Sequence, residues 1–231
     1  MTGHDIMMTE IVKTANVLRK EPSQRTTPKT GLYRNLGKRV LDTALILLSA
    51  PIIVPIVLAI AILVARDGGK PFYSQKRIGK GGHTFNIWKL RTMVDNADAV
   101  LEAYLEQNPA MRREWDTKQK LLDDPRVTRL GRFLRKCSID ELPQLLNVLR
   151  GDMSLVGPRP MMVDQKKLYH GVDYYDVRPG ITGFWQISDR NETSFADRVF
   201  YDARYNNKLS LKTDVKILLA TVNVVLRGTG C

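Results

Sequence analysis

One uncharged apolar segment, residues 43–65, constrains this chain more than any other feature. It reads TALILLSAPIIVPIVLAIAILVA and contains 23 residues. As a straight helix it would be about 35 Å long, enough to cross a bilayer. Pro51 and Pro55 lie within it, and each removes a backbone donor and bends a helix. The segment therefore predicts a membrane helix, either spanning or bent back on itself.

Basic residues flank this segment on both sides and favour the second alternative. They are Arg34, Lys38, Arg39 before it and Arg66, Lys70, Lys76, Arg77 and Lys80 after it. Lys and Arg accumulate on the cytoplasmic side of membranes, so both ends are expected on that side. We predict a re-entrant helix broken at Ser49 and Pro51, with the Ser49 hydroxyl satisfying freed backbone groups. Lys38 and Arg39 are expected to anchor it at the interface.

The remaining composition indicates a globular domain with an anionic partner. The formal net charge is +12, from 36 Lys and Arg against 24 Asp and Glu. Beside an apolar segment, this charge favours anionic lipid and phosphorylated substrates. No recognition-helix motif supports nucleic acid binding. Cys137 and Cys231 lack companions for a metal site and indicate a reducing compartment.

The expected fold class is α+β, in three parts. Residues 1–32 form a mobile N-terminal tail, residues 33–67 a basic lead-in and re-entrant helix, and residues 68–231 a small cytosolic domain. Strands at 71–78 and 83–93 flank the glycines of GKGG at 79–82. This favours a β-hairpin over a phosphate-binding loop, because no Walker spacing follows.

Helical patterns occupy much of the rest of the chain. Residues 94–122 have helical character, interrupted near Pro109. Residues 129–136 (RLGRFLRK) form a basic amphipathic helix, suited to a membrane interface or to an ordinary protein surface. Residues 215–226 are apolar but too short to span, so they predict a buried or interfacial helix.

The sequence SIDELPQ at 138–144 holds the strongest candidate for chemistry. Ser138 and Glu141 have capping-box spacing, which predicts a helix from about 138 to 149. Asp140 and Glu141 could merely complement the helix dipole. Alternatively, the positive helix end keeps Asp140 ionised and nucleophilic, and the two carboxylates with phosphate oxygens form a site for Mg²⁺.

Cations in rigid settings accompany these carboxylates. Arg159 lies between two prolines in VGPRP, and Arg178 precedes a proline in RPGITGFWQ, which ends at Gln186. Such backbones hold a guanidinium in a fixed direction, as a phosphate clamp requires. Lys89 and Arg91 add charge at the end of the predicted hairpin.

Together these motifs resemble the bacterial sugar transferases, the monotopic polyprenyl-phosphate phosphoglycosyl transferases. The resemblance rests on KR with Asp42, the proline-interrupted helix, KLRTM at 89–93, DPRVTR at 124–129, SIDELPQ, MSLVGPRP and RPGITGFWQ, and is greatest for rhizobial exopolysaccharide-initiating members. It implies that a hexose-1-phosphate moves from a UDP-sugar to polyprenyl phosphate, with release of UMP, at the cytoplasmic face of the inner membrane. The hexose stays open between galactose and glucose, with a preference for galactose.

The same resemblance implies residue roles. Asp140 would be the covalent nucleophile, and Glu141 would hold Mg²⁺ beside it. The implied and candidate substrate-binding residues are Lys89, Arg91, Arg126, Arg129, Arg135, Arg159, Arg178 and Gln186. A homodimer and contacts with downstream glycosyltransferases are further expectations. Two alternatives stay open: a phosphohydrolase that uses the same aspartate, and a non-catalytic single-span scaffold or regulator of polysaccharide assembly.

Overall fold

The computed structural model describes residues 30–66, 68–118, 121, 123–188 and 195–226. The predicted N-terminal tail lies almost entirely outside these residues. The structure is a mixture of helices and small sheets, as the predicted α+β class requires. Its helices are η1 (Tyr33–Gly37), α2 (Lys38–Ala65), α3 (Ala97–Gln107), α4 (Pro109–Lys118), α5 (Arg129–Lys136), η3 (Ile139–Gln144), α6 (Leu145–Arg150), α7 (Arg198–Lys208) and α8 (Leu211–Leu226). Short helical turns occur at η2 (Lys80–Gly82), η4 (Asp164–Leu168) and η5 (Asp173–Asp176).

The strands are β1 (Phe72–Ile78), β2 (Thr84–Leu90), β3 (Ser154–Val156), β4 (Met161–Met162) and β5 (Gly180–Thr182). Strands β1 and β2 form the predicted antiparallel hairpin, and β4 adds to the outer edge of β1. Gly81 and Gly82 have positive φ angles, which explains the glycines at this turn. Strands β3 and β5 form a separate parallel pair.

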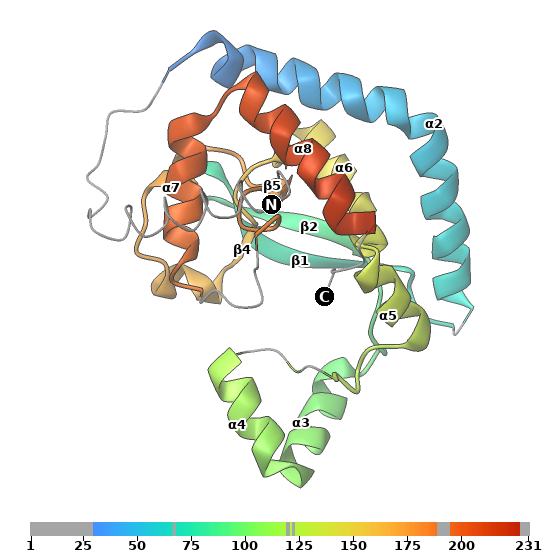
Figure 1. Ribbon diagram of the computed structural model, residues 1–231. Coiled ribbons are helices and arrows are strands. Elements are labelled where there is room, and N and C mark those ends of the chain that lie inside the picture. The colour runs from blue at the N-terminus through green and yellow to red at the C-terminus, as the bar shows by residue number, and fades with distance from the viewer. Residues whose placement is uncertain (1–29, 67, 119–120, 122, 189–194, 227–231) are drawn as a thin grey trace, which may run out of the picture.

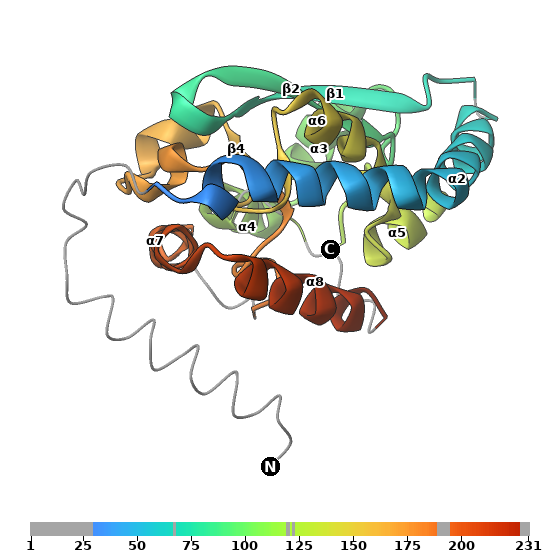
Figure 2. The ribbon, with the colours of Figure 1, turned by 90° about the horizontal axis from the view of Figure 1, so that it is seen from above.

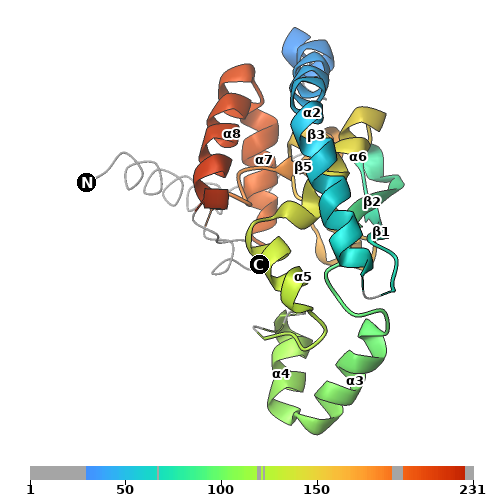
Figure 3. The ribbon, with the colours of Figure 1, turned by 90° about the vertical axis from the view of Figure 1, so that its right-hand side faces the viewer.

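Helix α2 runs along one edge of the molecule, as Figure 1 shows. Figure 2 shows the β1–β2 hairpin on one side of this helix and α7 with α8 on the other. The predicted interruption near Pro109 is confirmed, and Figure 3 shows α3 and α4 projecting together from one end of the molecule. The central core joins α2 to the hairpin and α6, through Ile46, Phe85, Ile87, Val148 and Met153.

Helix α2 is continuous through Pro51 and Pro55, so the predicted break at residues 49–51 does not end the helix. Instead the helix bends in its course, as Figure 1 shows. The Ser49 hydroxyl donates to the carbonyl of Ile46 (3.1 Å), one turn before the first proline. Together with η1, this helix is long and apolar enough to cross a membrane.

Most of the apolar surface of α2 is not covered by protein. Its exposed large side chains are Val40, Leu45, Leu47, Leu48, Ile52, Val54, Ile56, Leu58, Ile62 and Leu63. A continuous apolar surface of this kind marks an interaction site, and here its length matches a bilayer. The helix therefore indicates a membrane-associated protein.

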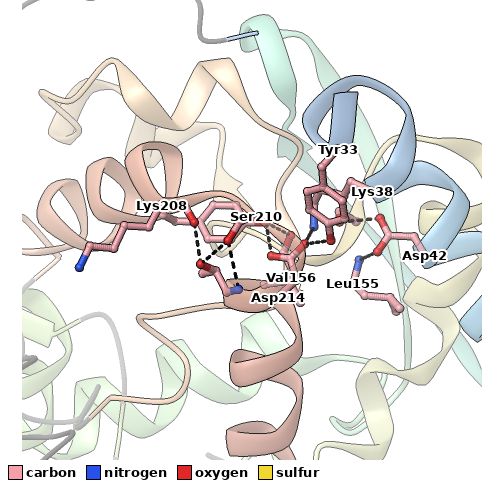
Figure 4. Close-up of polar contacts among 11 residues, drawn as sticks. Tyr33, Lys38, Asp42, Leu155, Val156, Lys208, Ser210 and Asp214 are labelled. Atoms are coloured by element: carbon pink, nitrogen blue, oxygen red, sulfur yellow. Dashed lines mark hydrogen bonds and ion pairs between the residues drawn. The ribbon is translucent and has the colours of Figure 1, made fainter. Parts of the chain in front are cut away.

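A buried polar cluster fixes the start of this helix to the domain (Figure 4). The Asp214 carboxylate on α8 accepts hydrogen bonds from Tyr33 (2.6 Å), Tyr205 (2.9 Å) and the Lys38 ammonium (2.7 Å). One turn on, Asp42 accepts from the hydroxyl of Ser154 (2.6 Å). The α2 helix is thus attached to both α8 and β3.

The predicted interface anchors take part in this docking instead. Lys38 is only 7% exposed, because it pairs with Asp214. The Arg39 guanidinium donates to the carbonyls of Val148 and Leu149 in the last turn of α6, and the Val148 carbonyl also accepts from the N–H of Gly151. The structure therefore gives both cations partners within the protein, and their contact with lipid headgroups remains a prediction.

Candidate active site

The two adjacent carboxylates lie on a short 3₁₀ helix, which differs from the predicted capped α-helix. Ser138 has a left-handed backbone (φ 56°) and makes no side-chain cap, so the predicted capping box is wrong. The segment winds as η3 from Ile139 to Gln144 and becomes α-helical only in α6. A capping serine needs an extended backbone, which the left-handed turn excludes.

Asn147 attaches this helical segment to the hairpin. Its side-chain amide donates to the carbonyl of Asn86 (2.7 Å) and accepts from the N–H of Trp88 (3.1 Å). The amide therefore continues the hydrogen bonding of β2 at its open edge. Lys89 follows Trp88 directly, so this contact fixes the lysine relative to Asp140 and Glu141.

The predicted catalytic carboxylates meet two of the predicted cations. The Lys89 Nζ lies 2.7 Å from Glu141 Oε1 and 3.5 Å from Asp140 Oδ2. The Arg159 Nη2 lies 3.6 Å from Glu141 Oε1. Residues distant in sequence thus form one charged cluster, which contains both groups able to attack a phosphate ester and groups able to neutralise one.

Asp140 is buried, and burial raises the pKa of its carboxyl above the ordinary value of 3.8. The positive charge of Lys89 opposes this rise, and the negative charge of Glu141 adds to it. The positive end of a helix would by itself lower the pKa of this carboxyl. Desolvation prevails because the carboxylate loses most of its water.

Close backbone packing places Arg159. A β-carbon on Gly157 would lie 2.4 Å from the carbonyl oxygen of Arg178, and one on Gly183 would lie 2.1 Å from that of Gly157. Only glycine allows this approach, which joins the VGPRP and RPGITGFWQ motifs. Arg198 donates to the carbonyl of Arg159, and both guanidinium groups face the ring of Trp185, at 5.4 and 5.8 Å.

Arg135 approaches the same carboxylates from α5. Its Nε donates to the hydroxyl of Thr92 (2.9 Å), and its charge favours the ionised form of Asp140. Helix α5 can lie this close because Gly131 contacts the Thr92 carbonyl, where a β-carbon would clash at 2.1 Å. The predicted cation position at Arg135 therefore borders the cluster.

The other predicted substrate-binding residues have different surroundings. Arg126 pairs with Asp124 (2.6 Å) and covers the ring of Trp115, and Arg129 is exposed at the start of α5. The Arg178 Nε donates to the carbonyl of Gly151 (2.8 Å). Arg91 donates to the carbonyls of Val64 and Lys70, both at 2.9 Å. Gln186 is buried, and its amide atoms have no hydrogen-bond partner among the described residues. The structure does not bring these five into the charged cluster.

Three residues near the carboxylates were missed by the sequence analysis. Arg77 and Gln144 line a small pocket together with Lys89, Glu141 and Arg159. Asn147 does not line this pocket, but it binds the carbonyl of Asn86 in β2. Strand alternation could have placed Arg77 on one face with Gln75, but did not show that this face meets η3. Gln144 and Asn147 required knowledge of how η3 and α6 pack on β2.

The donor set at the cluster fits a magnesium ion that is held partly by substrate. Within the described residues, no group of three or more His, Cys, Asp or Glu side chains gathers in one place. The protein therefore offers the two oxygen-bearing groups of Asp140 and Glu141. Mg²⁺ binds with one or two carboxylates and completes its octahedron with phosphate oxygens and water.

A second, larger cavity of about 360 Å³ lies where the end of α2 meets α5. Its lining combines apolar side chains with two cations: Leu63, Val64, Arg66, Arg91, Met93, Thr128 and Leu130. Such a lining suits an amphiphile with an anionic head. Lys89 lines the small pocket beside Glu141, and Arg91 and Met93 line this cavity, so residues 89–93 border both.

Comparison with known proteins gives a consistent result. The family model described as "Bacterial sugar transferase" matches residues 33–228. The chain is 46% identical over 208 residues to the exopolysaccharide production protein ExoY of Sinorhizobium fredii, covering 87% of this chain and 92% of that one. It is 42% identical to the UDP-galactose-lipid carrier transferase of Erwinia amylovora over 99% of this chain. It is 45% identical to the undecaprenyl-phosphate galactose phosphotransferase of Salmonella typhimurium over 84% of this chain. The chain spans less than half the length of the last two, 45% and 41%.

Proposed function

Since the chain belongs to the bacterial sugar transferase family, we propose that it transfers galactose-1-phosphate from UDP-galactose to undecaprenyl phosphate and releases UMP. This step would initiate exopolysaccharide synthesis, in keeping with the similarity to the ExoY proteins. The observation that carries the proposal is the cluster of Asp140 and Glu141 with Lys89 and Arg159, on a domain docked to an apolar helix.

The reaction would proceed in two displacements at one phosphorus atom. An oxygen of the Asp140 carboxylate attacks the phosphorus that bears the sugar, and the bond from this phosphorus to the oxygen shared with UMP breaks. UMP leaves, and the sugar phosphate remains on Asp140. A phosphate oxygen of undecaprenyl phosphate then attacks the same phosphorus, and the Asp140 carboxylate departs. Neither displacement needs a proton transfer, so positioning and charge neutralisation supply the catalysis.

The protein's cations are suited to this neutralisation. Lys89 pairs with Glu141 in the described structure, and an incoming diphosphate would compete for the lysine. Arg159 presents a planar fork beside the same carboxylate, which matches two phosphate oxygens. Asp140 and Glu141 would also hold Mg²⁺, which when bound supplies further positive charge to the diphosphate.

The location of the contacts on α2 supports a re-entrant helix. Near its start, Lys38 and Asp42 bind α8 and β3; at its end, Arg91 binds the carbonyl of Val64. Both ends therefore contact the same domain, and a bend makes this geometrically possible. A helix crossing the bilayer would have to separate these contacts. We therefore propose that α2 enters and leaves at the cytoplasmic face, where UDP-sugars are available.

The cavity between α2 and α5 suits the lipid acceptor. Leu63 and Leu130 would contact the polyprenyl chain, and Arg66, which is exposed at the end of α2, would meet its phosphate. Undecaprenyl phosphate would then reach Asp140 along the segment that carries Thr92. The donor sugar nucleotide would enter from the aqueous side.

Exchange of labelled UMP into UDP-galactose tests the first displacement without the lipid. We expect the wild-type protein to catalyse this exchange and the Asp140→Asn variant to lose it, because an amide cannot form the covalent intermediate. With undecaprenyl phosphate added, only the wild-type protein should form the lipid-linked sugar. A panel of UDP-sugars in the same assay identifies the hexose.

Substantial exchange by the Asn variant would refute the assignment of Asp140. Release of free sugar phosphate by the wild-type protein, without a lipid product, would instead favour the phosphohydrolase. Absence of exchange with every UDP-sugar would favour a non-catalytic scaffold.

A further inference from the structure

Two residues that line the pocket at the charged cluster each carry a buried nitrogen donor without a partner among the described residues. Among the described residues, Arg77 Nε and Gln144 Nε2 are buried and make no hydrogen bond, and both residues line the small pocket that holds Glu141, Lys89 and Arg159. Gln144 is only 2% exposed. A buried donor without a partner loses the free energy of its hydration, so two in one pocket point to a missing acceptor.

Two other hydrogen bonds of the Arg77 guanidinium hold it in place and so set the direction of its Nε. Its Nη2 donates to Gln75 Oε1 (2.6 Å), and its Nη1 donates to the carbonyl of Pro160 (3.3 Å). Burial, together with the nearby charge of Arg159, lowers the pKa of Arg77 to about 10. The guanidinium therefore stays charged at neutral pH and would be stabilised by an anion.

The charge and size of the pocket define what can enter. Arg77, Lys89 and Arg159 outnumber Glu141, so the pocket favours negative charge. Its volume is about 20 Å³, close to that needed for one water molecule. A sugar ring or a base cannot enter, whereas one oxygen of a phosphoryl group can.

We propose that Arg77 and Gln144 form a subsite for a non-bridging oxygen of the phosphate that leaves with the nucleotide. This inference rests on the proposed function. Glu141 lines the pocket and Asp140 does not, and Lys89 contacts both carboxylates. If Asp140 attacks the phosphorus bearing the sugar, the pocket beyond Lys89 receives the neighbouring phosphate. The two residues would then bind the UMP phosphate in both directions of the exchange.

Four variants separate this subsite from a structural role. Arg77→Lys keeps the charge but removes Nε, Gln144→Met removes the amide, and Gln144→Glu replaces a donor with an anion. Lys76→Met is the matched control, because Lys76 is exposed on the same strand. Calorimetry in magnesium-free buffer measures binding of UDP, inorganic pyrophosphate and uridine, and thermal unfolding monitors folding. The exchange assay gives the KM for UMP.

Arg77→Lys and Gln144→Met should each weaken binding of UDP and pyrophosphate about tenfold, as expected for one hydrogen bond to a charged group. Gln144→Glu should weaken it further, and the KM for UMP should rise in parallel. Uridine binding should not change in any variant, and Lys76→Met should match the wild type.

Unchanged UDP binding in Gln144→Glu would overturn the proposal, because a carboxylate can replace the amide only where the ligand is a hydroxyl or water. Unchanged UDP binding with a lower Tm in Arg77→Lys would also overturn it, and would leave Arg77 as support for the Pro160 loop. If the wild-type protein exchanges no UMP but its variants bind pyrophosphate more weakly, the subsite is supported and the proposed transferase activity is refuted.

Discussion

Two opposing effects determine the pKa of the Asp140 carboxyl. Burial favours its protonated form, and the charges of Lys89, Arg135 and Arg159 favour the ionised form that can attack phosphorus. Burial is the larger influence, so the folded protein binds the proton more tightly than the unfolded chain. A nucleophile kept partly desolvated in this way is reactive, and its ionisation lowers the stability of the fold.

This raised pKa predicts linked effects of pH on exchange and on stability. UMP exchange should fall as the pH drops through a value above 3.8, because only the ionised carboxylate attacks. For stability the sign is reversed: the contribution of Asp140 is present below pH 3.8 and is lost as the pH rises through the raised pKa. Asp140→Asn should therefore raise the Tm at pH 8, and should change it much less near pH 4. Thermal unfolding at both pH values measures this. A lower Tm for the Asn variant at pH 8 would contradict it.

The sequence was sufficient to identify those site residues that lie within recognisable motifs. Asp140, Glu141, Lys89 and Arg159 carry recognisable neighbours, and the structure brings these four together. Arg178 also precedes a proline, and Arg91 is two residues from Lys89, yet both bind backbone carbonyls, because their surroundings depend on how distant segments pack. A basic residue beside prolines or glycines is therefore expected to have a fixed side-chain direction. The packing of distant segments decides which carboxylate or carbonyl lies in that direction.

At the scale of elements, the side chain of Asn147 takes the place of a neighbouring strand. It pairs with the backbone at Asn86 and Trp88 and so holds α6 and η3 against β2. No periodicity in the sequence predicts such a contact. The hairpin itself was predictable, because its strands alternate and its turn contains the glycines with positive φ.

Asn147→Leu should destabilise the protein by about 2 kcal/mol, because it leaves the Trp88 N–H and the Asn86 carbonyl without this partner. The Tm would fall by about 4–8 °C for a chain of this size. UMP exchange should also slow, since Lys89 follows Trp88. Asn86→Ala is the matched control: its exposed side chain is lost, but the backbone carbonyl that binds Asn147 remains. Equal Tm values for the two variants would show that the Asn147 side chain does not hold α6 and η3 against β2.

At the scale of the whole molecule, exposed apolar side chains occur on several helices of the domain. Besides α2, they include Phe133 on α5 and Leu219 and Val222 on α8. The predicted membrane association of α5 and of the C-terminal helix remains a prediction that these exposures support. Bilayer contact through several helices would keep the active site near the lipid phosphates.

The re-entrant topology can be tested with single cysteines at Gly31 and Lys70, both exposed beside the ends of the apolar helix. In a background with Cys137 and Cys231 replaced by serine, we expect neither site to react with an impermeant maleimide in intact cells. Both should react after the inner membrane is permeabilised, which serves as the control. Reaction of one site alone in intact cells would establish a spanning helix.

The attachment of α2 to α8 has a consequence for biosynthesis. Lys38 is made 176 residues before its partner Asp214. At about 5–20 residues per second, roughly 10–35 s separate the two. During this interval α2 is outside the ribosome while the buried carboxylate that will bind Lys38 and Tyr33 does not yet exist. The membrane is the partner that we propose for this helix at that stage. We therefore expect insertion to precede completion of the fold, and translation of α8 to allow the helix to attach to its domain.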